Sequence, residues 1–180
     1  MSRSLYWFRN IRTRQVLAST ESSVQARPNL VKAQIRANLR PAALRPDHWQ
    51  PLVVAVGFET EKAQVDTFTL ASQPGHPLVP LTAAQKKAYT LLRNSDKRLV
   101  DMDMIERQVA QLARTLVYMD AVKSQSVPAA GRLRLLWEDD AWVGRVEEAG
   151  LVWPQWVEHG SLELKRGNMI LNEELHAAAE

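Results

Sequence analysis

The sequence predicts an α+β fold: a small β-sheet with an N-terminal hairpin, packed by two or three helices, plus an extended basic Arg-Pro arm. Three observations support this class. Residues 5–8 are aromatic and β-prone, residues 52–58 (LVVAVGF) form a continuous apolar run, and residues 101–124 carry apolar side chains at helical spacing. Short apolar runs are typical of strands, whereas a 3–4 spacing is typical of a helix with one buried face.

The first third of the chain supplies the hairpin and the arm. Residues 5–8 and 15–19 are predicted strands, and the basic stretch between them forms the tip. Residues 29–39 are predicted to form a basic helix. Pro41, Pro46 and Pro51 then recur every five residues. Because Arg40 and Arg45 each precede a proline, which disfavours helical geometry, residues 40–51 are predicted to be an extended arm.

The middle of the chain alternates strand and helix signals. Residues 52–58 are predicted to be a buried central strand, and residues 65–70 a second, alternating strand. Thr82 and Gln85 form a capping-box pattern that begins a helix ending near residue 93. The long helix over residues 101–124 is expected to pack its apolar stripe against the sheet. That stripe comprises Met102, Ile105, Val109, Leu112, Leu116 and Met119.

The last third predicts a strand over residues 132–137 and a short helix capped by Asp139 or Asp140 and ended by Gly150. A linker at 124–131, a turn at 167–168 and an acidic tail at 173–180 are also expected. Four tryptophans here are expected to form a second apolar cluster or a protein-facing surface, since tryptophan is enriched at interfaces: Trp137, Trp142, Trp153 and Trp156. We therefore divide the chain into a basic nucleic-acid-binding domain (1–127) and an acidic, tryptophan-rich segment (128–180) packed on it.

The charge distribution is asymmetric although the net charge is only +3. Residues 1–50 hold nine basic and two acidic residues, a balance of +7, whereas residues 101–180 hold eight basic and fourteen acidic residues, a balance of −6. Such asymmetry indicates a nucleic-acid or anionic partner at the basic end. The first twenty residues are also rich in Arg and Ser and free of acids, a composition typical of mitochondrial import segments. We expect a mitochondrial matrix protein.

Several kinds of chemistry have little support. The chain contains no cysteine, its four histidines lack metal-ligand spacing, and no phosphate-binding or nucleophile motif occurs. Residues 138–140 are acidic, but acids at a helix start are ordinary partners of the helix dipole. No run is long enough for a membrane span. We predict no catalytic residues, no cofactor, no metal and no membrane insertion, so the protein is not expected to be an enzyme.

The candidate nucleic-acid-binding residues lie in the basic first third. Arginine side chains on the hairpin, helix and arm supply fork-shaped donors for phosphates, and aromatic rings beside them can stack on bases. For Trp49, core packing is the stronger alternative. The predicted set is Arg9, Asn10, Arg12, Arg14, Lys32, Arg36, Arg40, Arg45, His48 and Trp49.

Two segments resemble a known family. Residues 6–19 (YWFRNIRTRQVLAS) are similar to its N-terminal signature, and residues 39–52 (LRPAALRPDHWQPL) to a second block that leads into a buried strand. The family is that of the fungal mitochondrial homologous-recombination and transcription-regulating protein, also found in the mitochondrial large ribosomal subunit. The resemblance covers residues 6–58, recurs weakly at 136–137 and 153–160, and leaves 59–127 unmatched.

The resemblance implies two roles. The first is a structural constituent of the mitochondrial large ribosomal subunit that binds ribosomal RNA beside neighbouring ribosomal proteins. The second is a DNA-pairing and transcription-regulating factor acting on mitochondrial DNA. A third hypothesis, of another class, is a protein–protein adaptor that uses the tryptophan-rich last third. We rank the ribosomal role first.

Overall fold

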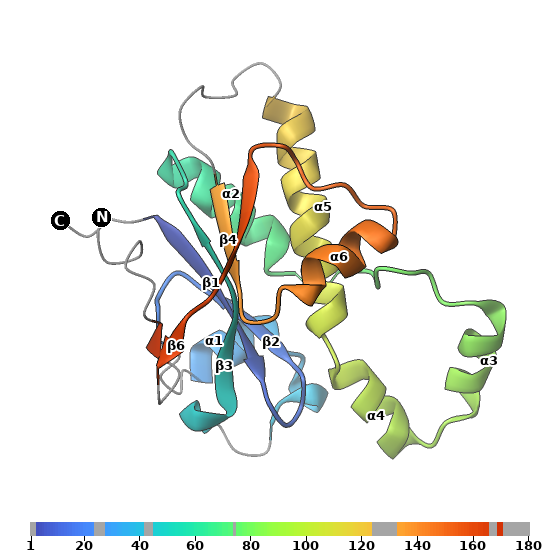
Figure 1. The fold of residues 1–180 in the computed structure, drawn as a ribbon. Helices are drawn as coiled ribbons and strands as arrows, with labels where there is room; N and C mark the ends of the chain where they lie inside the picture. Colours follow the sequence, from blue (N-terminus) through green and yellow to red (C-terminus); the bar gives the residue numbers. More distant parts are fainter. Residues whose placement is uncertain are drawn as a thin grey trace.

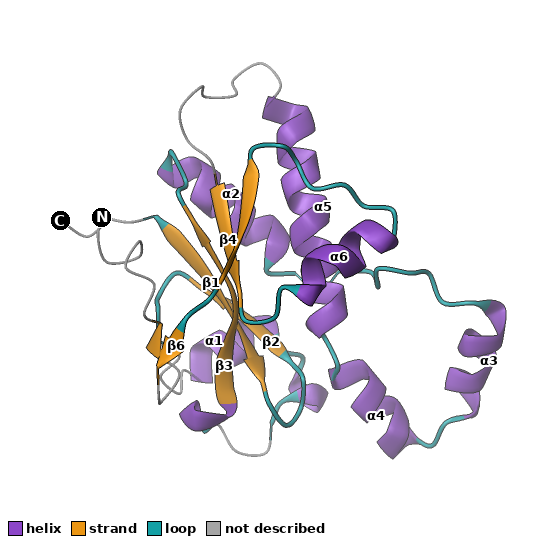
Figure 2. Ribbon diagram, in the orientation of Figure 1, coloured by secondary structure: helices purple, strands orange, loops and turns teal. Residues whose placement is uncertain are grey.

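A computed structural model describes residues 3–23, 28–41, 45–73, 75–123, 133–165 and 169–170. Its centre is a five-stranded mixed sheet in the order β2-β1-β3-β4-β5 (Figures 1 and 2). The α+β class with an N-terminal hairpin is confirmed. The predicted linker at 124–131 lies outside the described residues, as do the predicted turn at 167–168 and the predicted tail at 173–180.

The hairpin consists of β1 (Ser4–Asn10) and β2 (Val16–Ser19), paired antiparallel. β1 also pairs antiparallel with β3 (Trp49–Val56), which lies at the centre of the sheet between β1 and β4. The predicted strand at 52–58 is therefore the buried central strand, although it ends at Val56. β3 begins earlier than expected, so the end of the predicted arm belongs to the sheet.

The last third of the chain completes this sheet. β4 (Leu133–Trp137) pairs antiparallel with β3 and parallel with β5 (Val157–Ser161), and α6 (Ala141–Glu148) connects the parallel pair. A parallel pair requires such a crossover. Gly150 ends the helix with a φ of +81°, a conformation that glycine adopts without a side-chain penalty.

α2 (Glu61–Ala71) corrects the predicted strand at 65–70. The Thr60 hydroxyl accepts a hydrogen bond from the Ala63 amide (3.1 Å) and so caps the helix. The buried face comprises small residues four positions apart, Ala63, Thr67 and Ala71, whereas Val65 is 52% exposed. Because the inward-facing residues are small, the helical period carried little hydrophobic signal and the alternating pattern prevailed.

The other helices match the predictions in part. α1 (Pro28–Gln34) is shorter than the predicted helix and is followed by a 3-10 turn, η1 (Ala37–Leu39). α3 (Ala83–Leu91) begins with the predicted capping box, in which Thr82 and Gln85 bond reciprocally. The predicted helix at 101–124 is α5 (Ile105–Lys123), preceded by a separate helix, α4 (Asn94–Met102).

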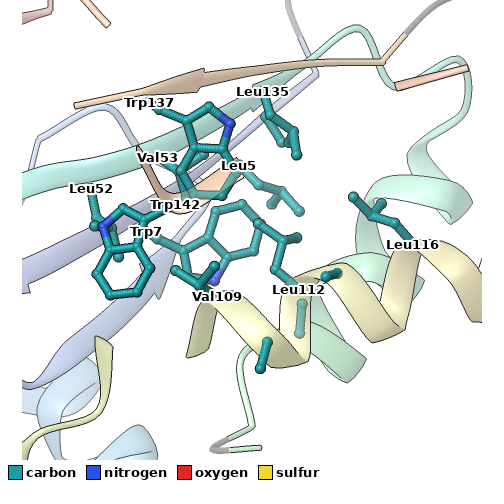
Figure 3. Packing of buried hydrophobic residues seen from close by; sticks show 14 of the residues in the cluster. Leu5, Trp7, Leu52, Val53, Val109, Leu112, Leu116, Leu135, Trp137 and Trp142 are labelled. Carbon is teal, nitrogen blue, oxygen red and sulfur yellow. The ribbon is translucent and has the colours of Figure 1, made fainter. Parts of the chain in front are cut away.

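The sheet has an apolar cluster on each face. α2, α5 and α6 cover the first face, where Trp7 lies beside Val109 and Leu112 of α5, and Trp137 belongs to the same apolar cluster (Figure 3). All six stripe residues predicted for the long helix are buried. Trp137, Trp142 and Trp153 belong to this same cluster, so the separate tryptophan cluster predicted from the sequence is wrong: these rings close the main core.

The second face is covered by α1. Val31 and Ile35 share an apolar cluster with Tyr6 and Phe8 of β1, and Leu162 joins it from the far edge of the sheet. α1 is fixed to the edge strand by its Gln34 side chain, which accepts from the Ala18 amide (2.8 Å) and donates to the Ala18 carbonyl (2.7 Å). A short ribbon, β6 (Leu164–Lys165) and β7 (Met169–Ile170), follows β5.

Candidate nucleic-acid interface

The hairpin tip is a tight turn organised by Asn10. The Asn10 side-chain oxygen accepts hydrogen bonds from the amides of Arg12 (2.9 Å) and Thr13 (3.0 Å), and the Asn10 side chain is almost wholly buried. Arg14 closes the turn with a φ of +58°, and its amide bonds the Asn10 carbonyl (2.9 Å). Asn10 therefore holds the turn, while Arg12 is exposed at its apex.

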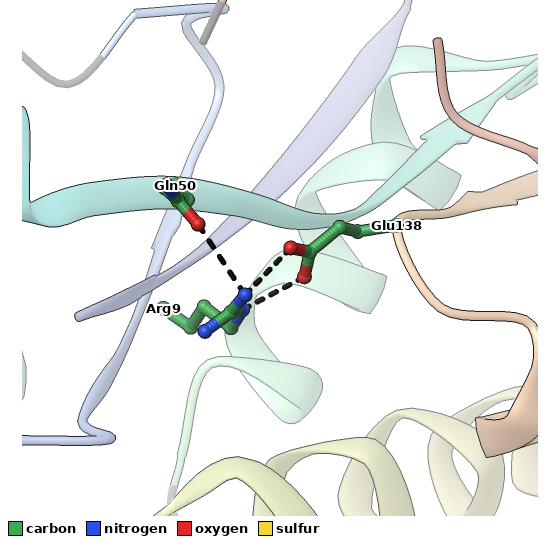
Figure 4. Close-up of polar contacts among 3 residues, drawn as sticks. All are labelled: Arg9, Gln50 and Glu138. Carbon is green, nitrogen blue, oxygen red and sulfur yellow. Dashed lines mark hydrogen bonds and ion pairs between the residues drawn. The ribbon is translucent and has the colours of Figure 1, made fainter. Parts of the chain in front are cut away.

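Arg9 is occupied within the protein. Its Nε donates to Glu138 Oε2 (2.7 Å) and its second guanidinium nitrogen to Glu138 Oε1 (2.5 Å), with Gln50 also in reach (3.3 Å; Figure 4). The hydrogen bond to Glu138 raises the pKa of Arg9 above its ordinary value. This two-point pair joins β1 to the residue that follows β4, so the guanidinium serves the fold.

Arg14 is engaged at the surface. Its Nε donates to Asp103 Oδ2 (2.5 Å), and its carbonyl accepts from the Met104 amide (3.0 Å). Both side chains of the ion pair stay about half exposed. The hairpin is thus pinned to the junction of α4 and α5.

The α1–η1 region holds three predicted site residues. Arg40 donates to the carbonyls of Ile35 and Lys32 (3.4 Å each), which lie at the C-terminal end of α1 where cations are favoured. Arg40 is half-buried, whereas Lys32 and Arg36 are exposed. Leu39 of η1 is tied to the hairpin by a bond from the Gln15 side chain to its carbonyl (2.6 Å).

The predicted arm at 40–51 is largely built into the domain. Arg40 and Arg45 have the extended backbone expected before proline. Residues 46–48 form a 3-10 turn, η2 (Pro46–His48), and residues 49–51 belong to β3; residues 42–44 lie outside the described part. The arm is shorter than predicted because strand pairing with β1 begins at Trp49.

Side chains of this segment have divergent roles. Trp49 is 4% exposed and packs in the second-face cluster, the core role given as its alternative. Arg45 pairs with Asp47 (2.9 Å), and this hydrogen bond lowers the pKa of Asp47. Arg45 remains 62% exposed, and His48 is half-buried with its carbonyl bonded to the Ile11 amide (2.9 Å).

These contacts bring the hairpin tip, η1 and η2 together at one end of the sheet. Ile11 bonds His48, Gln15 bonds Leu39, and Asn10 is the strand partner of Trp49. We call this surface the basic end and define it by four of its exposed cations: Arg12, Lys32, Arg36 and Arg45. Arg45 shares its charge with Asp47 of the same turn, and Arg14 is also exposed but pairs with Asp103 outside this surface. The other predicted site residues are engaged within the protein by hydrogen bonds or packing: Arg9, Asn10, Arg14, Arg40 and Trp49. His48 lies beside the hairpin tip.

Sequence reasoning overlooked cations beside the basic end. α4 contacts η1 and carries Lys97 and Arg98, which lie outside the first third of the chain. The sequence does contain three basic residues within 93–98: Arg93, Lys97 and Arg98. This segment lies outside the basic first third and in the part of the chain that the family resemblance does not cover.

The acidic cluster at 138–140 takes ordinary structural roles. Glu138 pairs with Arg9, and Asp139 accepts from the Ala141 amide (3.0 Å) at the start of α6. Within the described ranges, no group of three or more His, Asp or Glu side chains is placed to hold a metal ion. Helices of the described part are all too short or too polar to span a bilayer.

His159 lies against the tryptophans of the main core. Its Nδ1 accepts from Trp137 Nε1 (3.1 Å), and its ring packs edge-on to Trp153 at 4.8 Å between centroids. Partial burial lowers the pKa of His159, against a smaller opposing effect of the Glu147 charge. The pair fixes β5 beside β4.

Comparison with known proteins finds a match to one family model. Residues 2–71 match the Mhr1 family model, described as transcriptional regulation of mitochondrial recombination. No curated protein matches the chain in a sequence search. The matched residues include the hairpin, α1, η1, η2, β3 and α2, hence every residue of the basic end. The match over residues 2–71 of the chain to the Mhr1 family, described as transcriptional regulation of mitochondrial recombination, confirms the resemblance predicted from its sequence.

Proposed function

We propose that this protein is a structural constituent of the large subunit of the mitochondrial ribosome, in the mitochondrial matrix, where its basic end binds ribosomal RNA. One observation carries the proposal. Four exposed cations, Arg12, Lys32, Arg36 and Arg45, come from three segments that hydrogen bonds gather at one end of the sheet. Guanidinium and ammonium groups on such a surface suit a phosphate backbone.

The proposed partners follow from the charge distribution. The basic end takes the RNA, and the acidic last third is turned toward neighbouring ribosomal proteins or solvent, since acidic side chains repel phosphate. The same cations suit mitochondrial DNA. The family description names regulation of recombination and no enzymatic reaction, which favours a nucleic-acid-binding role without catalysis.

A sedimentation experiment tests the ribosomal proposal. Mitochondrial lysate is separated on a density gradient with and without RNase, and the protein is followed by immunoblot. We expect it in the large-subunit fractions, and at the top of the gradient after RNase or high salt. A protein that stays at the top of the untreated gradient contradicts the ribosomal role.

A second candidate is the DNA-pairing and transcription-regulating factor, which the family description favours. Purified protein is incubated with complementary single strands of DNA, and annealing is followed by fluorescence quenching. The DNA-pairing role is favoured over the ribosomal role by two results together. The wild type anneals the strands faster than an Arg12→Glu, Arg36→Glu variant, and the protein is absent from the large-subunit fractions.

The adaptor hypothesis loses its proposed surface. Three of the four tryptophans, Trp137, Trp142 and Trp153, are each at most 8% exposed. Trp156 is half-buried and donates to Asp120 (2.7 Å), so the four rings offer little area to a partner. A partner that stays bound after RNase treatment would have to use other residues.

A further inference from the structure

The helices α3 and α4 project from the body of the protein (Figures 1 and 2). None of the residues 79–101 is buried, although both helices are regular. We call residues 79–101 the α3–α4 projection. It lies outside the segment that matches the family model, and the core does not depend on it.

Polar contacts hold the projection together. Thr82 and Gln85 cap the start of α3. The Tyr89 hydroxyl donates to both carboxylate oxygens of Asp101 (2.9 and 3.0 Å), and Lys97 Nζ donates to the Thr90 carbonyl (3.0 Å). The two helices are thereby linked at the side-chain level without an apolar core.

The projection concentrates positive charge. It holds five basic residues against Asp96 and Asp101, a balance of +3, and one of those two acids is already bonded to Tyr89. The cations span both helices and the connection between them: Lys86, Lys87, Arg93, Lys97 and Arg98. They are five of the six basic residues between positions 51 and 100, so this charge is a local concentration.

The root of the projection lies at the basic end. Asp103, directly after α4, pairs with Arg14 of the hairpin (2.5 Å), and Met104 donates to the Arg14 carbonyl. α4 also contacts η1. These contacts hold the C-terminal end of α4 beside the hairpin, so the root of the projection lies next to the basic end.

Exposed apolar residues also lie on the projection, and they raise the alternative of a protein partner. Five large apolar side chains are exposed here: Val79, Leu81, Leu91 (78%), Leu99 (67%) and Val100. They are spread along the segment and interleaved with cations, and exposed apolar residues are common on protein surfaces, so we give more weight to the charge balance of +3 in a segment with no buried residue. Charge complementarity favours a polyanion.

We propose that the α3–α4 projection is a second phosphate-binding element, which grips the nucleic-acid backbone beside the part held by the basic end. The inference rests on the proposed function only for the identity of the ligand. It extends the interface beyond the first third of the chain. Because phosphate contacts carry no sequence information, the projection is expected to add affinity and orientation without sequence preference.

Charge reversal on the full chain tests the projection. The variant Lys86→Glu, Lys87→Glu, Arg98→Glu removes three cations and spares Lys97, which bonds Thr90. Binding to a short RNA hairpin and to poly(U) is measured by fluorescence anisotropy over a salt series. We expect at least about a tenfold loss of affinity near 0.1 M salt, and a log–log salt slope shallower by about 2 to 3.

Three control variants separate the outcomes. Lys62→Glu, at the start of α2, should bind as the wild type, and circular dichroism verifies each fold. If Arg12→Glu, Arg36→Glu loses affinity and the projection variant does not, the inference is overturned while the proposed function stands. If neither variant loses affinity, both fail. If Leu91→Ser, Leu99→Ser abolishes co-sedimentation and the charge variant binds normally, the projection docks a protein, which also overturns the inference.

Discussion

Arg9 on β1 and Glu138 after β4 form a two-point ion pair, with nitrogen–oxygen distances of 2.7 and 2.5 Å, across 129 residues of sequence. Both side chains are about one quarter exposed. The pair connects the family-matched segment to the last third of the chain, so a residue predicted for nucleic acid also secures the sheet.

Removal of this pair is expected to cost stability. Arg9→Gln should lower the free energy of unfolding by about 1–3 kcal/mol, because it leaves a partly buried carboxylate without its partner. Urea denaturation of Arg9→Gln, Glu138→Gln and the double variant measures the coupling. We expect the double variant to lose less than the sum of the singles. Full additivity would contradict a direct interaction.

The turn at Asn10 should be sensitive to the loss of one acceptor. Asn10→Leu keeps the approximate size but leaves the Arg12 and Thr13 amides unpaired, so we expect a loss of about 2 kcal/mol. Asn10→Asp preserves the acceptor and serves as the matched control. Thermal unfolding ranks the three proteins. Equal melting temperatures for the leucine variant and the wild type would show that these bonds are dispensable.

We expect the basic end to account for most of the salt-dependent nucleic-acid binding. Arg12→Glu and Arg36→Glu should each weaken RNA binding, while Lys62→Glu, near the opposite end of β1, should not. Four phosphate contacts imply a log–log salt slope no shallower than about −3 for the wild type. Anisotropy titrations check this. Equal losses from all three variants would indicate a net-charge effect without a defined surface.

Acidification should weaken the contact of β4 with β5 at His159. Burial lowers the pKa of His159 in the folded protein, so the folded state binds its proton less readily than the unfolded state. The contribution of neutral His159 to the free energy of unfolding is therefore complete above the ordinary histidine pKa of about 6.5, and it is lost as the pH falls below that value. Protonation at Nδ1 would also remove the acceptor for Trp137 Nε1.

Tryptophan fluorescence during urea unfolding, at pH values from about 7.5 down to 5.5, measures this effect. His159→Gln should show a flatter dependence of unfolding free energy on pH over that window. If the variant and the wild type lose stability in parallel, other groups are responsible for the acid sensitivity.

The sequence predicted elements whose signal is local and strong. The run at 52–58 identified the central strand, and the stripe from Met102 to Met119 identified the buried face of the long helix. α2 was missed because its buried face consists of Ala63, Thr67 and Ala71, whose hydrophobic period is weak. Periodicity reports the size and polarity of buried residues, so a helix that packs through small side chains escapes it.

The candidate site was less predictable than the fold. The sequence pointed to the basic third, yet it could not distinguish the exposed Arg12 from Arg9, whose carboxylate partner lies after β4. Trp49 similarly lies near arginines in the sequence, but the pairing of β3 with β1 places its ring in the core. Long-range contacts decide which polar groups stay available, and no local pattern contains them.

The central strand also sets the order in which the protein can fold. Val53 of β3 pairs with Trp137 of β4, so 84 positions (137 − 53) separate these neighbours in the sheet. Contacts so distant in sequence slow folding, because the closure of a long loop precedes any gain from them. Until β4 arrives, β3 presents an unpaired apolar edge of the kind that aggregates. A chain that emerges N-terminus first therefore exposes this edge of β3 until β4 has been synthesised.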